Sequence, residues 1–156
     1  MAKSTVKMDS GDLEKLKKQI LKYGDETNID LFLQSCAKEL AARLLRKLFK
    51  TTLPGQYPPG SGKVGGTLRR GWLGDQKSVT AAVNNLKVKK QGHDYVIEII
   101  NPVDYASYVE YGHRTRGHKS WVEGKFYMTI SEKQIQNIAP AVIEKKLKKY
   151  LGECFK

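Results

Sequence analysis

The chain has 156 residues, the length of one typical domain, and its 28 Lys and Arg against 16 Asp and Glu give a formal net charge of +12. Charged or amide residues interrupt every apolar run well before the ~20 residues of a membrane span, and residues 1–12 lack the apolar core of a signal peptide. We therefore expect a basic intracellular protein with one domain over residues 1–156 and no membrane association. The positive charge would attract nucleic acids, but it also suits a subunit that docks on acidic neighbours.

Two amphipathic helices are predicted over about residues 12–50. Apolar side chains recur every three or four residues from Asp12 to Tyr23, and Gly24 ends this first helix. The second helix begins at about residue 28 or 30 and ends at Lys50. Its apolar stripe contains Ile29, Phe32, Leu33, Cys36, Leu40, Leu44 and Leu48. We expect this longer helix to form the main wall of the core.

A long loop is predicted over residues 51–66, because this segment contains three Pro and five Gly. Loops of this length in compact domains are usually functional or disordered. We expect a mobile loop that becomes ordered only against a partner.

An antiparallel sheet is predicted over about residues 77–101. Apolar and polar residues alternate over 86–89 and again over 95–100, and residues 91–94 supply a turn, which indicates a hairpin. A third strand is expected within residues 77–83.

The C-terminal part is predicted to be helical apart from one loop. Asp104 can cap a short helix that stops at Gly112, and an exposed loop is expected over residues 112–123. Helices follow over about residues 125–151, the last of them starting at Pro140. The predicted class is therefore α+β, with an antiparallel sheet packed against N-terminal and C-terminal helices and a long Pro/Gly-rich loop.

Residues 109–127 hold two His, two Arg and two Lys among two Tyr, a Trp and a Phe. His113 and His118 are five residues apart, with no Cys nearby and no second acidic group at a metal-ligand spacing. Ser120 stands in no nucleophile motif, and Cys36 and Cys154 are isolated thiols that suit a reducing compartment. We predict no catalytic residue, no cofactor and no metal.

Two other functions are considered, those of a metal-dependent nuclease and of a nucleic-acid-binding protein. Asp104 followed by Glu123 and Lys125 imitates the spacing of a metal-dependent nuclease, but Gly124 is a poor residue for the buried strand that such a site needs. The interleaved aromatic and basic side chains could bind nucleic acid by stacking and phosphate contacts, although no known nucleic-acid-binding motif accompanies them.

Three segments carry a resemblance to a known family: "GTLRRGW" at 66–72, "YASYVEYGHRTR" at 105–116 and "WVEGKFYMTISE" at 121–132. Together they resemble phage proteins similar to gene product ten of Hong Kong phage 97, a family of tail-component or head-tail joining proteins that also occurs in defective prophages and phage-tail-like bacteriocins. The resemblance covers about residues 60–156, while the N-terminal helices agree with the family only in kind.

The resemblance implies a structural, non-enzymatic subunit of a phage tail or tail-like particle, assembled in the bacterial cytoplasm. It implies a ring at the tail end, of six copies by analogy, acting as a terminator or a head-tail connector. The implied partners are copies of the chain itself, tail tube, sheath or terminator proteins and a portal-side connector protein. DNA would meet the chain only in the lumen of the ring.

Within this interpretation, the charged and aromatic stretch is a candidate subunit interface, because Arg and aromatic side chains are favoured interface anchors. The candidate interface residues are Arg69, Arg70, Trp72, Tyr108, Glu110, Tyr111, His113, Arg114, Arg116 and Trp121. Asp104 and Glu110 are candidate partners for Arg114 or Arg116, in the same subunit or in a neighbour.

Overall fold

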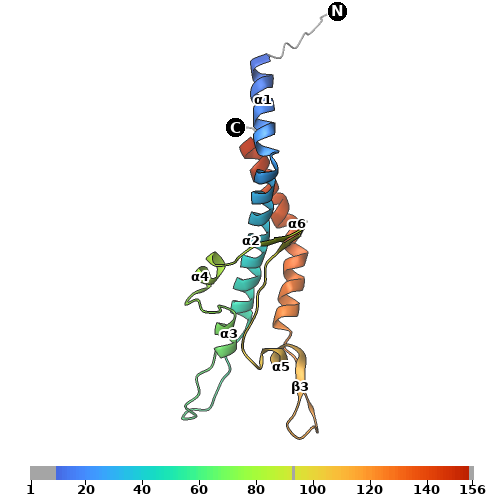
Figure 1. The fold of residues 1–156 in the computed structure, drawn as a ribbon. Helices are drawn as coiled ribbons and strands as arrows, with labels where there is room; N and C mark the ends of the chain where they lie inside the picture. The colour runs from blue at the N-terminus through green and yellow to red at the C-terminus, as the bar shows by residue number, and fades with distance from the viewer. Residues whose placement is uncertain (1–9, 93, 155–156) are drawn as a thin grey trace, which may run out of the picture.

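Two long antiparallel helices form the axis of the molecule. The computed structural model describes residues 10–92 and 94–154. Helix α1 (Ser10–Tyr23) leads into α2 (Glu26–Thr51), and α6 (Tyr127–Cys154) lies alongside α2 (Figure 1). α2 and α6 run in opposite directions, since Phe32 near the start of α2 contacts Tyr150 near the end of α6, with 4.8 Å between the ring centroids.

The small core lies on one side of α2. Ala42, Leu45 and Leu48 recur every three residues along that helix, so they share one face, and all three are buried. Two short helices, α3 (Thr67–Gly71) and α4 (Val79–Asn84), lie against this face. The core residues that they contribute are Trp72 and Leu73, which directly follow α3, and Ala82 and Val83 of α4. The buried Trp72 Nε1 donates a hydrogen bond to Oγ1 of the fully buried Thr52 at 2.8 Å, so its polar atom is satisfied.

The strands form two separate antiparallel pairs. β1 (Lys89–Gln91) pairs with β2 (Asp94–Val96) in a ribbon that contacts α2. β3 (Gly112–Arg114) pairs with β4 (Trp121–Glu123) in a hairpin after the short helix α5 (Ala106–Tyr111). The α+β class and the hairpin predicted near residues 86–100 are confirmed, although residue 93 of its turn lies outside the described residues.

Four predicted features are wrong. Residues 77–83 contain the start of helix α4 and no strand, because the Ser78 side chain accepts a hydrogen bond from the Ala81 N–H at 3.1 Å and so starts a helix. Residues 112–123, expected as a loop, contain the β3–β4 hairpin. The sheet expected over 77–101 is reduced to the three-residue strands β1 and β2.

The fourth wrong prediction is a break at Pro140, which lies inside the continuous helix α6. A proline within a helix removes one backbone hydrogen bond, here the bond to the carbonyl of Gln136. Both Gln136 and Pro140 are exposed, so water can satisfy that carbonyl. Contacts on both sides of Pro140, of Tyr127 and Met128 with the core and of Tyr150 with Phe32 of α2, then hold the helix together.

Two loops project from the end of the molecule opposite to α1. Residues 52–66 contain neither helix nor strand and project at the same end as the β3–β4 hairpin (Figure 1). No helix among the described residues is both long enough and apolar enough to cross a membrane.

Candidate functional site

The candidate site is the end of the molecule formed by α5 and the β3–β4 hairpin, and Glu110 fixes it to α6. The Glu110 carboxylate is 9% exposed and accepts hydrogen bonds from the backbone N–H groups of Met128 and Thr129, both at 2.9 Å, and from the Thr129 hydroxyl at 2.8 Å. These two N–H groups belong to the first turn of α6, where no partner exists within the helix. Glu110 therefore caps α6 from 18 residues away, and its charge suits the positive end of the helix dipole.

Two glycines allow the hairpin to cross the end of α5 closely. Gly112 has φ 83°, a conformation that a side chain disfavours, and a Cβ there would lie 2.5 Å from the Val122 carbonyl oxygen. A Cβ on Gly124 would lie 2.4 Å from the Glu110 carbonyl oxygen. Backbone hydrogen bonds from Lys125 to Val109 (2.7 Å) and from Phe126 to Glu110 (3.1 Å) lie at the same crossing. The base of the hairpin is therefore rigidly placed.

The tip of the hairpin, residues 115–120, is held by hydrogen bonds between its two ends. The Thr115 N–H donates to the Ser120 carbonyl at 3.0 Å, and the Thr115 hydroxyl accepts from the Ser120 hydroxyl at 3.2 Å. Arg116, His118 and Lys119 are exposed between these ends. A charged tip is therefore presented on an ordered frame.

Large aromatic side chains surround this frame and remain exposed. We call this part of the molecule the aromatic end, and it comprises Tyr105, Tyr108, Tyr111, Trp121 and Phe126. Tyr111 is 64% exposed and Trp121 is 55% exposed, and Val122 adds an exposed aliphatic side chain. Clusters of exposed aromatic side chains of this size are usually buried against a partner in the assembled state. The aromatic end therefore has the character of a surface that a partner covers.

His113 lies between the hairpin and α5. Its ring is 5.7 Å from the ring of Tyr108, and its buried Nδ1 has no hydrogen-bond partner. Arg114 and Arg116 are exposed on the hairpin, and among the described residues neither pairs with the exposed Asp104.

Two of the ten candidate interface residues are used inside the fold. Trp72 is a core residue, because its ring packs beside Leu45 and Leu73. The Glu110 carboxylate accepts three hydrogen bonds from the start of α6, and among the described residues it forms no ion pair with Arg114 or Arg116, its expected partners. The sequence did not indicate this, because the groups that Glu110 binds belong to a helix that follows it at a distance.

Arg69 and Arg70 brace the base of the loop 52–66. The Arg69 guanidinium lies 4.3 Å from the ring centroid of Phe49, and its buried Nε has no hydrogen-bond partner. Arg70 donates to the Gly65 carbonyl at 3.2 Å and to the Thr67 hydroxyl at 3.4 Å. A small cleft of about 200 Å³ lies between this loop and α5 and is lined by residues of both, such as Tyr57 and Val109. The two groups of candidate residues therefore lie at the same end of the molecule.

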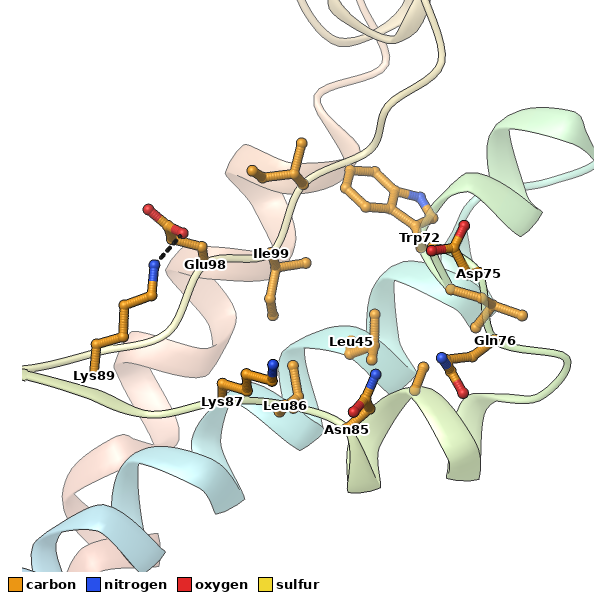
Figure 2. A pocket seen from close by; sticks show the side chains of 14 residues that line it. Leu45, Trp72, Asp75, Gln76, Asn85, Leu86, Lys87, Lys89, Glu98 and Ile99 are labelled. Atoms are coloured by element: carbon orange, nitrogen blue, oxygen red, sulfur yellow. Dashed lines mark hydrogen bonds and ion pairs between the residues drawn. The ribbon is translucent and has the colours of Figure 1, made fainter.

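A cleft that the sequence did not indicate opens where the β1–β2 ribbon meets the core. It measures about 400 Å³, with Leu45, Trp72, Leu86 and Ile99 as its apolar part and polar side chains at its rim (Figure 2). Lys89 and Glu98 form an ion pair of 3.1 Å across the ribbon at one edge of the cleft (Figure 2).

A second feature missed at the sequence level attaches the same ribbon to α2. Lys90 Nζ binds both oxygens of Asp30, at 2.8 and 2.9 Å, and the Tyr95 hydroxyl donates to the same carboxylate. The hydrogen bonds from Lys90 and Tyr95 hold the pKa of Asp30 below its usual value, and the hydrogen bond to Asp30 raises the pKa of Lys90 and of Tyr95. This cluster joins residues 60 or more positions apart, so only the fold reveals it.

The residues weighed for a nuclease are also placed by the structure. Glu123 is the last residue of β4 and is exposed, as are Asp104 and Lys125. The described residues contain no group of three or more His, Cys, Asp and Glu arranged to hold a metal ion.

Residues 14–112 match the model of a protein family described as "Bacteriophage HK97-gp10, putative tail-component". The chain belongs to this family. The resemblance that the sequence motifs indicated is therefore confirmed, and membership places the chain among the structural components of phage tails and their virions. No curated protein and no solved structure matches the chain.

The matched residues correct the expected extent of the resemblance. All of α2 and α1 from residue 14 onward lie inside the match, although these helices were expected to agree with the tail-component family only in kind. The match ends at Gly112, so α6 and nearly all of the β3–β4 hairpin lie outside it. In this tail-component chain, the role of the hairpin therefore has to be argued from its own geometry.

Proposed function

We propose that this tail-component chain closes or connects the end of a phage tail or tail-like particle, by forming a ring of identical copies. The ring is a terminator or a head-tail connector, and it contains six copies by analogy with the family. The chain acts without catalysis. Its partners are its own copies, tail tube, sheath or terminator proteins and a portal-side connector protein, and assembly takes place in the bacterial cytoplasm.

The observation that carries this proposal is the aromatic end. Exposed Tyr and Trp side chains with nearby arginines have the composition of a protein interface core. The Glu110 cap and the close packing at Gly124 hold these side chains in place before any partner binds, which lowers the entropic cost of docking.

The amount of exposed surface supports a role in assembly. The chain has a solvent-accessible surface of 12303 Å², whereas a compact monomer of 17.6 kDa has about 7,900 Å². The elongated two-helix shape (Figure 1) gives the chain this large surface, which includes many exposed apolar side chains that neighbours in an assembly would cover.

The test is an image of the assembled particle with this subunit labelled. We expect a label fused to the chain to appear as a ring at one end of purified tails, at the same level in every particle. A label distributed along the whole tube, or absent from purified tails, would contradict the proposal.

A further inference from the structure

A groove rich in positive charge lies between α2 and α6, away from the aromatic end and from the core. It consists of two adjoining clefts of about 790 and 880 Å³ that share Glu39, Arg43 and Ile138. We call it the basic groove. The α2 residues that line it lie on a different face of the helix from Leu45 and Leu48, which pack into the core.

Seven cations and one carboxylate line the basic groove. α2 contributes Arg43, Arg46, Lys47 and Lys50, and α6 contributes Lys145, Lys146 and Lys149. With Glu39 as the one acidic residue, the groove has a net charge of +6, which is half of the +12 of the whole chain.

Most of this charge has no counter-charge within the described residues. Glu39 pairs with Arg43 at 2.8 Å, and Lys149 lies 3.9 Å from Glu153. Lys146 donates to a backbone carbonyl at 2.8 Å, which leaves its charge uncompensated. The other four cations form no ion pair with any described residue. Like charges gathered in this way repel one another, so an anionic partner would bind here with a favourable electrostatic energy.

The floor of the basic groove is apolar. Ile135, Ile138 and Val142 recur every three or four residues on α6, with Ala141 beside them, and Ile138 is 42% exposed. The α2 wall from Glu39 to Lys50 is about 17 Å long at 1.5 Å per residue. This length and this combination of an apolar floor with charged walls fit a helix of about three turns.

We propose that the basic groove binds an acidic amphipathic helix of another protein. Such a helix would place its apolar ridge on Ile138 and its carboxylates between the cations of α2 and α6. A nucleic acid would satisfy the cations but has no apolar ridge to cover the floor. A second copy of this chain is disfavoured, because its own amphipathic helix α1 contains more Lys than Asp and Glu.

The proposal is tested with a synthetic helical peptide of about four turns, with Leu on one face and Glu on the others. A matched control peptide has Gln in place of every Glu. We expect the Glu peptide to bind the full chain with an affinity that falls as salt rises, and at least tenfold more tightly than the Gln peptide. Absence of binding by the Glu peptide at tens of micromolar would overturn the proposal.

Variants of the chain locate the binding. Arg46→Glu with Lys50→Glu should weaken binding of the Glu peptide at least tenfold, whereas Lys63→Glu with Lys133→Glu makes the same change in net charge outside the groove and should weaken it less than twofold. Equal weakening by both pairs would mean non-specific attraction and would overturn the proposal. If the first pair fails to fold by circular dichroism, Arg46→Gln with Lys50→Gln serves in its place, with an expected loss of about threefold or more.

The apolar floor separates a helix from a nucleic acid. Ile138→Ser should weaken the Glu peptide at least threefold, and it should leave the binding of a short DNA duplex unchanged. The contrary result is a duplex that binds more tightly than the peptide, with binding that Arg46→Glu and Lys50→Glu abolish and Ile138→Ser leaves unchanged. In that case the groove is a nucleic-acid site and the proposal is wrong. All of these measurements use the isolated subunit, so they stand or fall independently of ring formation.

Discussion

The carboxylate of Glu110 binds both the backbone N–H and the hydroxyl of Thr129, at 2.9 and 2.8 Å, and so joins α5 to the start of α6. Glu110→Ala leaves the N–H groups of Met128 and Thr129 without partners in a partly buried position. We expect this change to lower the free energy of unfolding by about 1–3 kcal/mol, measured by urea denaturation. Glu123→Ala removes an exposed carboxylate of the β3–β4 hairpin and should change stability by less than about 0.5 kcal/mol. Equal losses in the two variants would show that Glu110 does not act as a cap.

Gly124 tests the close crossing of α5 and the hairpin. Gly124→Ala places a methyl group 2.4 Å from the backbone carbonyl of Glu110, and a backbone group cannot move aside cheaply. We expect a loss of about 1–3 kcal/mol or more in the free energy of unfolding. Gly117→Ala, at the exposed tip, meets nothing closer than 3.8 Å and is the matched control. Wild-type stability in Gly124→Ala would mean that the hairpin does not cross α5 as closely as described.

Local patterns in the sequence predicted the elements whose signal is local. The apolar periodicity of α1 and α2 and the stop at Gly112 are all found in the structure. Helix α4 was not predicted, because it is only six residues long and too short to show an apolar period. The β3–β4 hairpin was not predicted, because its tip lacks an Asn-Gly type of turn, which marks a hairpin in a sequence.

The features of the candidate sites were missed for a different reason. They depend on contacts between residues that are distant in the chain. The sequence pointed to the stretch around Arg114, and the structure confirms that aromatic and basic side chains are exposed there. It gave no sign that Glu110 is occupied by Thr129. It also could not show that cations near residues 43–50 and 145–149 face one groove, since each helix alone has the pattern of a solvated basic face.

Asp30 makes the attachment of the β1–β2 ribbon dependent on pH. Since its pKa is lowered in the folded chain, the Asp30 carboxylate stabilises the fold above its unfolded pKa of about 3.9 and loses this effect as pH falls through the folded value. The raised pKa of Lys90 preserves the pair up to about pH 10.4, above which the contribution is lost as Lys90 deprotonates. The attachment should therefore be complete between about pH 4 and pH 10.

The measurement compares the melting temperatures of wild type and Asp30→Asn between pH 2 and pH 7. We expect a constant gap above about pH 4 that narrows at lower pH, as the wild-type carboxylate becomes protonated. Asp104→Asn, at an exposed carboxylate with no ion pair to a described residue, should melt like wild type throughout. A gap between wild type and Asp30→Asn that stays constant down to pH 2 would contradict the role of the charge.

The loop 52–66 is expected to be mobile in the free subunit and fixed by neighbours in the particle. Lys63 is its one Lys or Arg and is exposed, so brief digestion with trypsin should cut the free chain there. The same cut should be slowed at least tenfold in intact particles. Lys63→Gln identifies the fragment by its absence, and equal cutting of free and assembled chains would show that no neighbour covers this loop.

Arg114 and Arg116 test whether the aromatic end is a docking surface. Both side chains are exposed in the isolated chain, and exposed charges contribute roughly 0–1 kcal/mol to stability. Replacing both with Ala should therefore leave the melting temperature within a few degrees of wild type. At an interface, loss of a desolvated Arg that faces a carboxylate costs roughly 2–5 kcal/mol, and a ring repeats this loss at every contact. The double variant should be absent from purified tails, while Lys77→Ala with Lys133→Ala, two exposed cations elsewhere, should be incorporated normally. Full incorporation of the Arg variant would refute docking through this surface, and a collapsed melting temperature would mean that the two arginines hold the fold instead.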